Sequence, residues 1–180
     1  MKVFLQYSPR SSRVNAVLIY NTIKRMGHTH ISKFVEKVDP DKFYAENEEY
    51  WSKRYIASLK EMDHADICFF ETSIPSTAMG QLAQLSVEKF KPTILLYTKD
   101  GKPYFFRGLA GVEKRVQLLE YNNKNLEDVL RYAFEFAEDF LSTRFTLLFP
   151  TDIIAYLNKI KKSGSSRSVY IRSLIRKDMK

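Results

Sequence analysis

Two short segments of the chain hold the side chains best suited to bind a small polar ligand. Residues 6–13 and 71–80 are both rich in hydroxyl groups. Such hydroxyls, together with the free N–H groups of a helix that begins near Ser76 and Thr77, suit a phosphate or a carboxylate. The candidate ligand-binding residues are Tyr7, Ser8, Glu71, Ser73, Ser76, Thr77 and Gly80. An equally good interpretation is that Ser76 or Thr77 only caps that helix.

Other side chains offer little metal or cofactor chemistry. His28 and His30 would share one face of a strand, which suits a metal pair, but no Cys, third His or obvious carboxylate completes a ligand set. We therefore expect no metal, and without a glycine-rich nucleotide motif we expect no cofactor. The aromatic residues Tyr50, Trp51 and Tyr55 recur at helical spacing. This spacing favours core packing over a platform that stacks bases.

The first 141 residues alternate between apolar strands and segments with helical periodicity. Strands are expected at 3–5, 30–35, 67–70, 93–97 and 116–119, and helices at 12–26, 46–62, 78–89 and 126–140. The runs 67–70 and 93–97 are continuously apolar, as strands covered by helices on both faces require. The pattern predicts an α/β domain over 1–141, a doubly wound, mostly parallel five-stranded sheet of the Rossmann or flavodoxin type. Such sheets bind ligands beyond the carboxyl ends of their strands, where 6–13 and 71–80 fall.

Residues 142–180 differ from the rest of the chain in charge. They contain nine Lys or Arg against two Asp or Glu, so they hold +7 of the formal net charge of +8. Because this excess lies in a segment with its own pattern of elements, we expect nucleic acid as a partner. The pattern is a strand, an amphipathic helix, a turn at Gly164 and a second helix. A strand and two helices cannot bury a core alone, so this domain, 142–180, is expected to form a homodimer.

One motif in the first domain has a family resemblance. It consists of Ala65-Asp66, an apolar strand, Glu71, Pro75-Ser76 and Gly80. Residues 65–97, and more weakly 1–140, thereby resemble the nucleoside 2-deoxyribosyltransferase family, which includes the deoxynucleoside 5′-monophosphate N-glycosidases. The resemblance implies that Ser76 binds a phosphate or hydroxyl and that Glu71 is the acid at the strand end. The family's nucleophilic Glu falls on Leu82, which cannot form a glycosyl ester.

The resemblance therefore implies a nucleotide-binding fold whose glycoside chemistry is lost. A second departure points the same way, because the family's Asp falls near Ser58 and its first loop is replaced by Gln6-Tyr-Ser-Pro-Arg10. The alternative is that Glu71 acts as an acid or nucleophile in a rearranged site.

The tail has a resemblance of its own. The stretch Gly164-Ser-Ser-Arg-Ser-Val-Tyr-Ile-Arg-Ser-Leu-Ile-Arg176 and the preceding Pro150 resemble the ribbon-helix-helix DNA-binding family. In that family paired strands lie in the DNA major groove, and the second helix clamps a phosphate by its N-terminus. The DNA-binding residues that the resemblance implies are Arg144, Thr146, Leu148, Ser165, Ser166 and Arg167. Leu148 can touch only apolar surface such as a thymine methyl, so a dimerisation device that does not bind DNA is the alternative.

Taken together, the two domains favour a DNA-binding transcriptional regulator whose first domain binds a nucleotide-like ligand without cleaving it. One alternative is an active N-glycosidase or deoxyribosyltransferase that uses Glu71. Another is an antitoxin-like interaction module. No apolar run approaches the length of a membrane span and no secretory leader is recognisable, so we expect no membrane partner and a cytoplasmic location.

Overall fold

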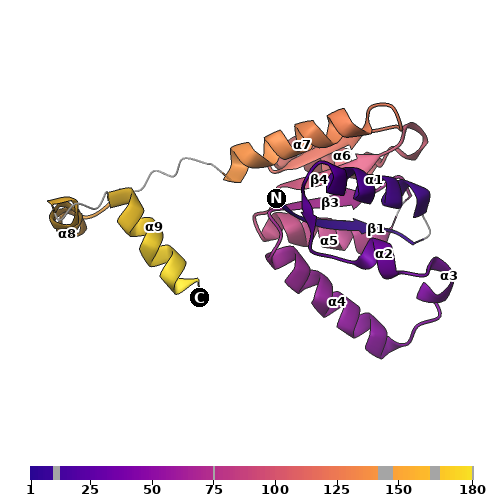
Figure 1. Ribbon diagram of the computed structural model, residues 1–180, viewed down its shortest axis with the longest axis horizontal. Coiled ribbons are helices and arrows are strands. Elements are labelled where there is room, and N and C mark those ends of the chain that lie inside the picture. Colours follow the sequence, from indigo (N-terminus) through magenta and orange to yellow (C-terminus); the bar gives the residue numbers. More distant parts are fainter. Residues whose placement is uncertain (10–12, 75, 142–147, 163–166, 180) are drawn as a thin grey trace. The chain divides into compact units, whose positions relative to one another are not determined.

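The computed structural model describes residues 1–9, 13–74, 76–141, 148–162 and 167–179. Its internal contacts divide the chain into two compact units, Met1–Thr143 and Arg144–Lys180. In Figure 1 the colours follow the sequence, so the first unit runs from indigo to orange and the second is yellow at its end. The two units are described separately below.

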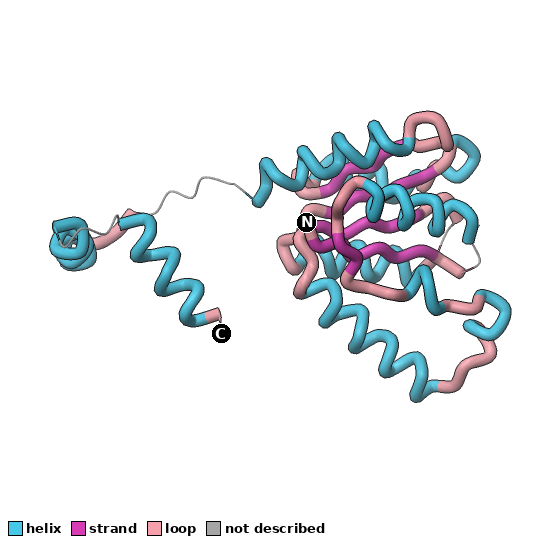
Figure 2. Tube along the Cα trace, in the orientation of Figure 1, coloured by secondary structure: helices cyan, strands magenta, loops and turns pink. Residues whose placement is uncertain are grey.

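The N-terminal unit is built on a five-stranded sheet, drawn in magenta in Figure 2. Its strands are β1 (Lys2–Tyr7), β2 (Thr29–His30), β3 (Ile67–Glu71), β4 (Thr93–Tyr97) and β5 (Val116–Glu120). They lie in the order β2-β1-β3-β4-β5, and all neighbouring pairs are parallel. This is the flavodoxin-like strand order, and it confirms the predicted fold class of the first domain.

Successive side chains of a strand point to opposite sides of the sheet, so both faces carry apolar side chains. Helices cover both faces. They are α1 (Arg13–Arg25), α2 (Phe34–Lys37), α3 (Pro40–Phe43), α4 (Glu48–Asp63), α5 (Thr77–Glu88), α6 (Tyr104–Val112) and α7 (Leu126–Leu141), with a short 3-10 turn, η1 (Lys99–Gly101). Val3 and Leu5 pack with α1, α2 and α7 on one face, whereas Phe4 and Phe70 pack with α4, α5 and α6 on the other. Within the described ranges, every helix is too short or too polar to span a lipid bilayer.

The region after β2 differs from the expected strand over 30–35. β2 ends at His30, and Ser32 turns the chain because its Oγ accepts a hydrogen bond of 3.1 Å from the Phe34 N–H. The next residues form α2, and α3 then begins with Pro40 in its first turn after Asp39, which caps it. A second difference is α6, since no helix was expected between 97 and 116. The segment 30–35 was assigned to a strand because the turn at Ser32 and the cap at Asp39 could not be recognised in the sequence.

The C-terminal unit contains α8 (Thr151–Lys162) and α9 (Arg167–Asp178), where two helices were expected. The Tyr156 and Tyr170 hydroxyls join them by a hydrogen bond of 2.7 Å, and Leu157 is buried. The expected strand falls largely on 144–147, outside the described residues, and the described residues 148–150 form no strand. Several apolar side chains of this unit remain more than 40% exposed, and on the two helices they include Ile154, Leu174 and Ile175.

Candidate functional site

The carboxyl ends of β1 and β3 form a topological switch point. The chain passes from β1 to α1 on one face of the sheet and from β3 to α5 on the opposite face. Tyr7 and Glu71 are register partners at the last positions of the two strands. The β1–α1 and β3–α5 connections diverge here, so a crevice opens at this edge of the sheet. Sheets of this class bind their ligands in such a crevice.

A cavity of about 230 Å³ lies at this edge between α4 and α5, and we call it the α4–α5 pocket. Aromatic rings form much of its wall, and they are Phe34, Phe43, Tyr44, Trp51 and Tyr55. The other lining residues include the polar Gln6, Tyr7, Ser8, Arg54, Ser58, Ser76 and Gln81. None of the described residues that line the pocket is Asp or Glu. The pocket therefore offers flat apolar faces and hydrogen-bonding groups with no carboxylate.

The aromatic wall is held together by edge-to-face contacts around Phe43. Its ring centroid lies 5.7 Å from that of Phe34, 5.1 Å from that of Tyr44 and 4.5 Å from that of Trp51. Tyr55 is 43% exposed and Trp51 is half-buried, so the expectation of core packing is wrong for Tyr55. The helical spacing was correct, but this face of α4 borders a cavity rather than the core.

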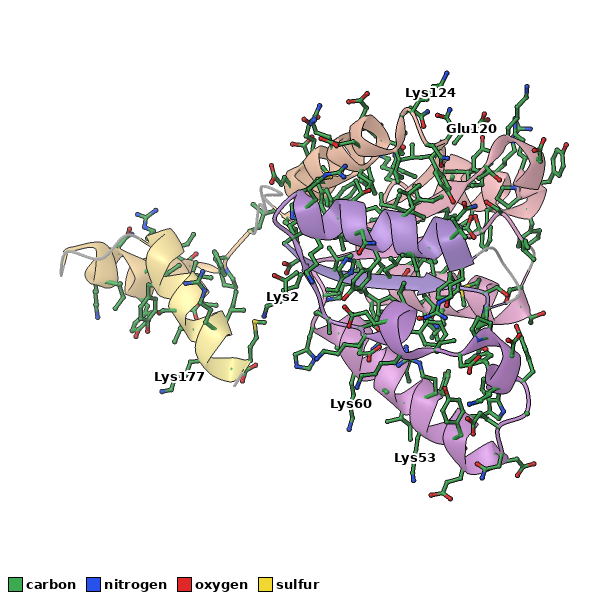
Figure 3. The ribbon with its side chains drawn as sticks, turned by 45° about the vertical axis from the view of Figure 1, so that its right-hand side comes forward. Lys2, Lys53, Lys60, Glu120, Lys124 and Lys177 are labelled. Carbon is green, nitrogen blue, oxygen red and sulfur yellow. The ribbon has the colours of Figure 1, made fainter. Side chains whose placement is uncertain are left out.

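Among the described residues that line the pocket, Arg54 on α4 is the one with a charged side chain, and sequence reasoning missed it. Its guanidinium donates to both carboxylate oxygens of Glu61, at 3.3 and 3.2 Å, and lies 4.6 Å from the centre of the Phe34 ring. Its Nη2 also reaches Gln6 Oε1 at 3.4 Å. Arg54, Ser58 and Glu61 recur at helical spacing, which was the available signal that they share one face of α4. In Figure 3 the labelled Lys53 and Lys60 point away from the unit instead.

A second cavity, of about 760 Å³, lies on the other side of the α5 N-terminus. Ser76, Thr77 and Gly80 line it together with Lys102 and side chains of α6. Ser76 stands at the N-cap position, but its side chain makes no capping hydrogen bond. Its hydroxyl is thus not used to cap α5, and Ser76 borders both cavities.

Gly80 lies in the first turn of α5. Its N–H donates to the Ser76 carbonyl at 3.1 Å, and a Cβ placed there meets no atom within 4 Å. Helical geometry does not require glycine here, because only positive φ or close approach does.

We expect Gly80→Ala to raise the free energy of unfolding by about 0.4–1 kcal/mol, since alanine restricts the unfolded chain and favours the helix. Chemical denaturation would measure the change. Gly101→Ala is the opposite control, because its Cβ would lie 2.3 Å from the Ser73 carbonyl oxygen, and it should destabilise the unit. A loss of stability in Gly80→Ala would show that the start of α5 needs glycine for another reason.

Glu71 and Ser73 line neither cavity. Glu71 is fully buried on the sheet face that α1 and α7 cover, where its Oε1 accepts hydrogen bonds from the Ser73 hydroxyl and from the Tyr121 hydroxyl at 3.1 Å. Burial and the neighbouring carboxylate raise the pKa of Tyr121. Glu71 Oε2 and the Tyr7 hydroxyl are buried without a hydrogen-bond partner among the described residues. The predicted ligand set is therefore divided between two faces of the sheet.

Leu82 lines the α4–α5 pocket from α5 and is 7% exposed. Leu82, which the family resemblance would align with the nucleophile, thus lies at the pocket, whereas the candidate carboxylate Glu71 lies outside it.

His28 and His30 do not form a metal site. His28 stacks on Phe134 and its Nδ1 lies 3.1 Å from the Met1 amino group, whereas His30 stacks on Tyr20 and its Nε2 lies 2.9 Å from the Tyr20 carbonyl. Among the described residues, no group of three or more His, Cys, Asp or Glu could hold a metal ion. The two imidazoles act as packing residues around β2.

Because burial lowers the pKa of both histidines, the unfolded chain binds their protons more readily than the folded chain. We therefore expect the free energy of unfolding to fall as the pH drops through the range from about 7 to 5.5. Denaturation curves across this range, with His30→Gln as the comparison, would measure it. An equal decline in His30→Gln would show that His30 does not contribute.

Two of the six predicted DNA-binding residues lie among the described ones. Leu148 is 96% exposed, and Arg167 begins α9, where its guanidinium donates to the Asn158 side chain. The other four, Arg144, Thr146, Ser165 and Ser166, lie outside the described residues. Lys177 projects outward from α9 in Figure 3. The predicted DNA-facing set therefore stays a prediction.

No family model matches the chain, and no curated protein does. Among solved structures it is similar to the CMP N-glycosidase of Clostridium botulinum, with a TM-score of 0.49 and 17% sequence identity. The match covers 73% of this chain and 99% of that one. The activity of this chain is therefore inferred from its own residues.

Proposed function

We propose that the N-terminal unit binds a nucleotide-like ligand in the α4–α5 pocket without cleaving it. The observation that carries the proposal is the lining: aromatic rings, one arginine, amides and hydroxyls, and no carboxylate among the described residues. A nucleobase presents a flat face to such rings and a polar edge to such donors. The first turn of α5 meets the same pocket at Ser76, where its free N–H groups favour a phosphate.

The chemistry of the pocket supports binding without cleavage. Glycoside cleavage uses carboxylates on both sides of the sugar, and Leu82 supplies none. Glu71 is fully buried on the other face and already accepts hydrogen bonds from Ser73 and Tyr121. The enzyme alternative needs Glu71 to reach a ligand from there, so binding without turnover is the better supported function.

The test uses Trp51, which is the chain's single tryptophan and lines the pocket. Nucleoside monophosphates would be titrated while tryptophan fluorescence is recorded, and the mixtures would then be separated to detect free base. We expect a saturable change in fluorescence and no free base. Failure of every nucleotide to change the signal, with binding also absent by calorimetry, would overturn the proposal. Free base that disappears in Glu71→Ala would establish the enzyme instead.

We further propose that the C-terminal unit binds DNA as a homodimer, which would make the chain a transcriptional regulator. Two observations favour this: the charge of +7 over 142–180 and the exposed apolar side chains Ile154, Leu174 and Ile175. Binding to DNA from upstream of the chain's own gene should exceed binding to scrambled DNA, and the preference should persist at higher salt. Equal binding that collapses with salt would mean that the tail supplies only charge.

The two proposed functions are connected only if the ligand prefers one arrangement of the dimer to another. A titration of DNA with and without nucleotide would measure that preference. An interaction module of the antitoxin type remains the third hypothesis, and it predicts a second protein that co-purifies with the chain.

A further inference from the structure

We infer that the α4–α5 pocket selects a base with a lactam edge, a ring carbonyl beside a ring N–H, and that Gln6 is the residue that reads it. Hypoxanthine, guanine and uracil carry this edge, whereas adenine carries an amino group in place of the carbonyl. The inference rests on the proposed function, because it names the class of base that the same pocket would bind. The inference follows from the atoms of Gln6 and Ser58 that remain free to form a hydrogen bond with a ligand.

The side-chain amide of Gln6 is fixed in one orientation by Arg54. A guanidinium donates and cannot accept, so the atom of Gln6 that faces it must be the oxygen. Gln6 Oε1 does lie 3.4 Å from Arg54 Nη2. No described residue accepts a hydrogen bond from the Gln6 amino group, and Gln6 lines the pocket although it is only 5% exposed. Gln6 therefore presents a donor to the ligand.

Arg54 is itself held from several sides. Glu61 binds both terminal nitrogens of the guanidinium, and the Phe34 ring packs against its face. The Arg54 and Glu61 side chains are 17% and 21% exposed, so water competes little for this ion pair. Arg54 thus acts as a positioning residue that fixes the amide of Gln6, and it adds further donors to the same side of the pocket.

Ser58 supplies the complementary acceptor. Its hydroxyl donates to the Arg54 carbonyl at 3.0 Å, so the proton is used and the oxygen lone pairs remain. Ser58 and Gln6 both line the pocket. A donor from Gln6 and an acceptor from Ser58 match a carbonyl and an adjacent N–H. Against adenine, the Gln6 amino group would face another amino group, and two donors cannot satisfy each other.

The experiment compares nucleotides that differ at one edge. Inosine and adenosine 5′-monophosphate form one pair, and uridine and cytidine 5′-monophosphate form the other. Dissociation constants from Trp51 fluorescence, excited where nucleotides absorb little, should favour inosine over adenosine and uridine over cytidine by at least about tenfold. Gln6→Glu replaces the donor by an acceptor, and it should abolish or reverse both preferences.

Three further variants make the result decisive. Gln6→Leu removes the donor without adding charge, and it should weaken binding of the oxo bases if Gln6→Glu does not fold. Arg54→Lys keeps the positive charge but loses the planar guanidinium that orients the Gln6 amide. Nucleotides should still bind, but with a smaller preference for inosine over adenosine and for uridine over cytidine. Gln84→Glu introduces the same change at an exposed position of α5 that does not line the α4–α5 pocket, so it should leave the base preference unchanged.

Each outcome has a distinct meaning. Equal affinity for inosine and adenosine monophosphate, with a clear Trp51 response, would overturn the inference and leave the proposed function standing. A preference that survives in Gln6→Glu would overturn the role of Gln6. The absence of binding by any nucleotide would overturn the proposed function, and the inference with it.

Discussion

Replacement of Glu71 by alanine is expected to lower the free energy of unfolding by about 2–4 kcal/mol. The carboxylate is fully buried and accepts hydrogen bonds from the Ser73 N–H and hydroxyl and from the Tyr121 hydroxyl. Its removal would leave these donors buried without a partner and open a small cavity, and both effects destabilise. Urea denaturation of the purified variant would measure the loss.

The cost of burying the carboxylate opposes this loss, so the sign of the change in the free energy of unfolding is informative. A buried carboxylate costs free energy, and Glu71 Oε2 has no hydrogen-bond partner among the described residues. Glu71→Gln separates the two effects, because the amide keeps an oxygen for Ser73 and Tyr121 but loses the charge. We expect it to change stability by less than about 1 kcal/mol. Glu71→Ala could instead prove as stable as the parent or more so. The carboxylate would then lower the stability of the fold, which is typical of a group kept for ligand binding.

The sheet could be predicted because its signals are strong in sequence. The runs at β3 and β4 are continuously apolar and are fully buried, as strands covered on both faces must be. The segment from Ser32 to Phe43 could not be assigned in the same way. It depends on one side-chain hydrogen bond at Ser32 and one cap at Asp39, and short apolar runs give no periodicity that separates a strand from a helix.

The site was only partly predictable from the sequence. The alternation of side chains along each strand explains why the predicted ligand-binding residues lie on two faces of the sheet. Gln6 and Glu71 both lie near strand ends, so they were assigned to one ligand. Side chains alternate along each strand, and Glu71 is in phase with Ile67 and Phe69, which pack toward α1 and α7. Gln6 is in phase with Phe4, which packs toward α4 and α5. Parity alone could have separated the two residues, whereas the contact of Arg54 with Gln6 joins positions 48 residues apart and needs the folded chain.

In the proposed DNA-binding dimer, a glutamate at Ile154 or Ile175 is expected to separate the two copies and to weaken DNA binding by more than about 100-fold. Leu157 is buried in this unit, but Ile154 and Ile175 are 43% and 55% exposed. A carboxylate at either position would have to be desolvated in a dimer interface without a partner, which is strongly unfavourable. Because a dimer binds DNA through two linked units, loss of the dimer removes the gain from bivalency, which reaches 10²–10⁴.

The control for this prediction separates dimerisation from charge. Ser173→Glu places the same carboxylate at an exposed position of α9, where repulsion of DNA phosphates would act equally. Light scattering and DNA anisotropy should show a dimer with nearly normal affinity for Ser173→Glu, and a monomer with weak affinity for Ile154→Glu. If both variants lose affinity to the same extent, charge and not dimerisation governs DNA binding. If the parent chain is itself a monomer that binds DNA tightly, the exposed apolar side chains of α8 and α9 serve a different partner.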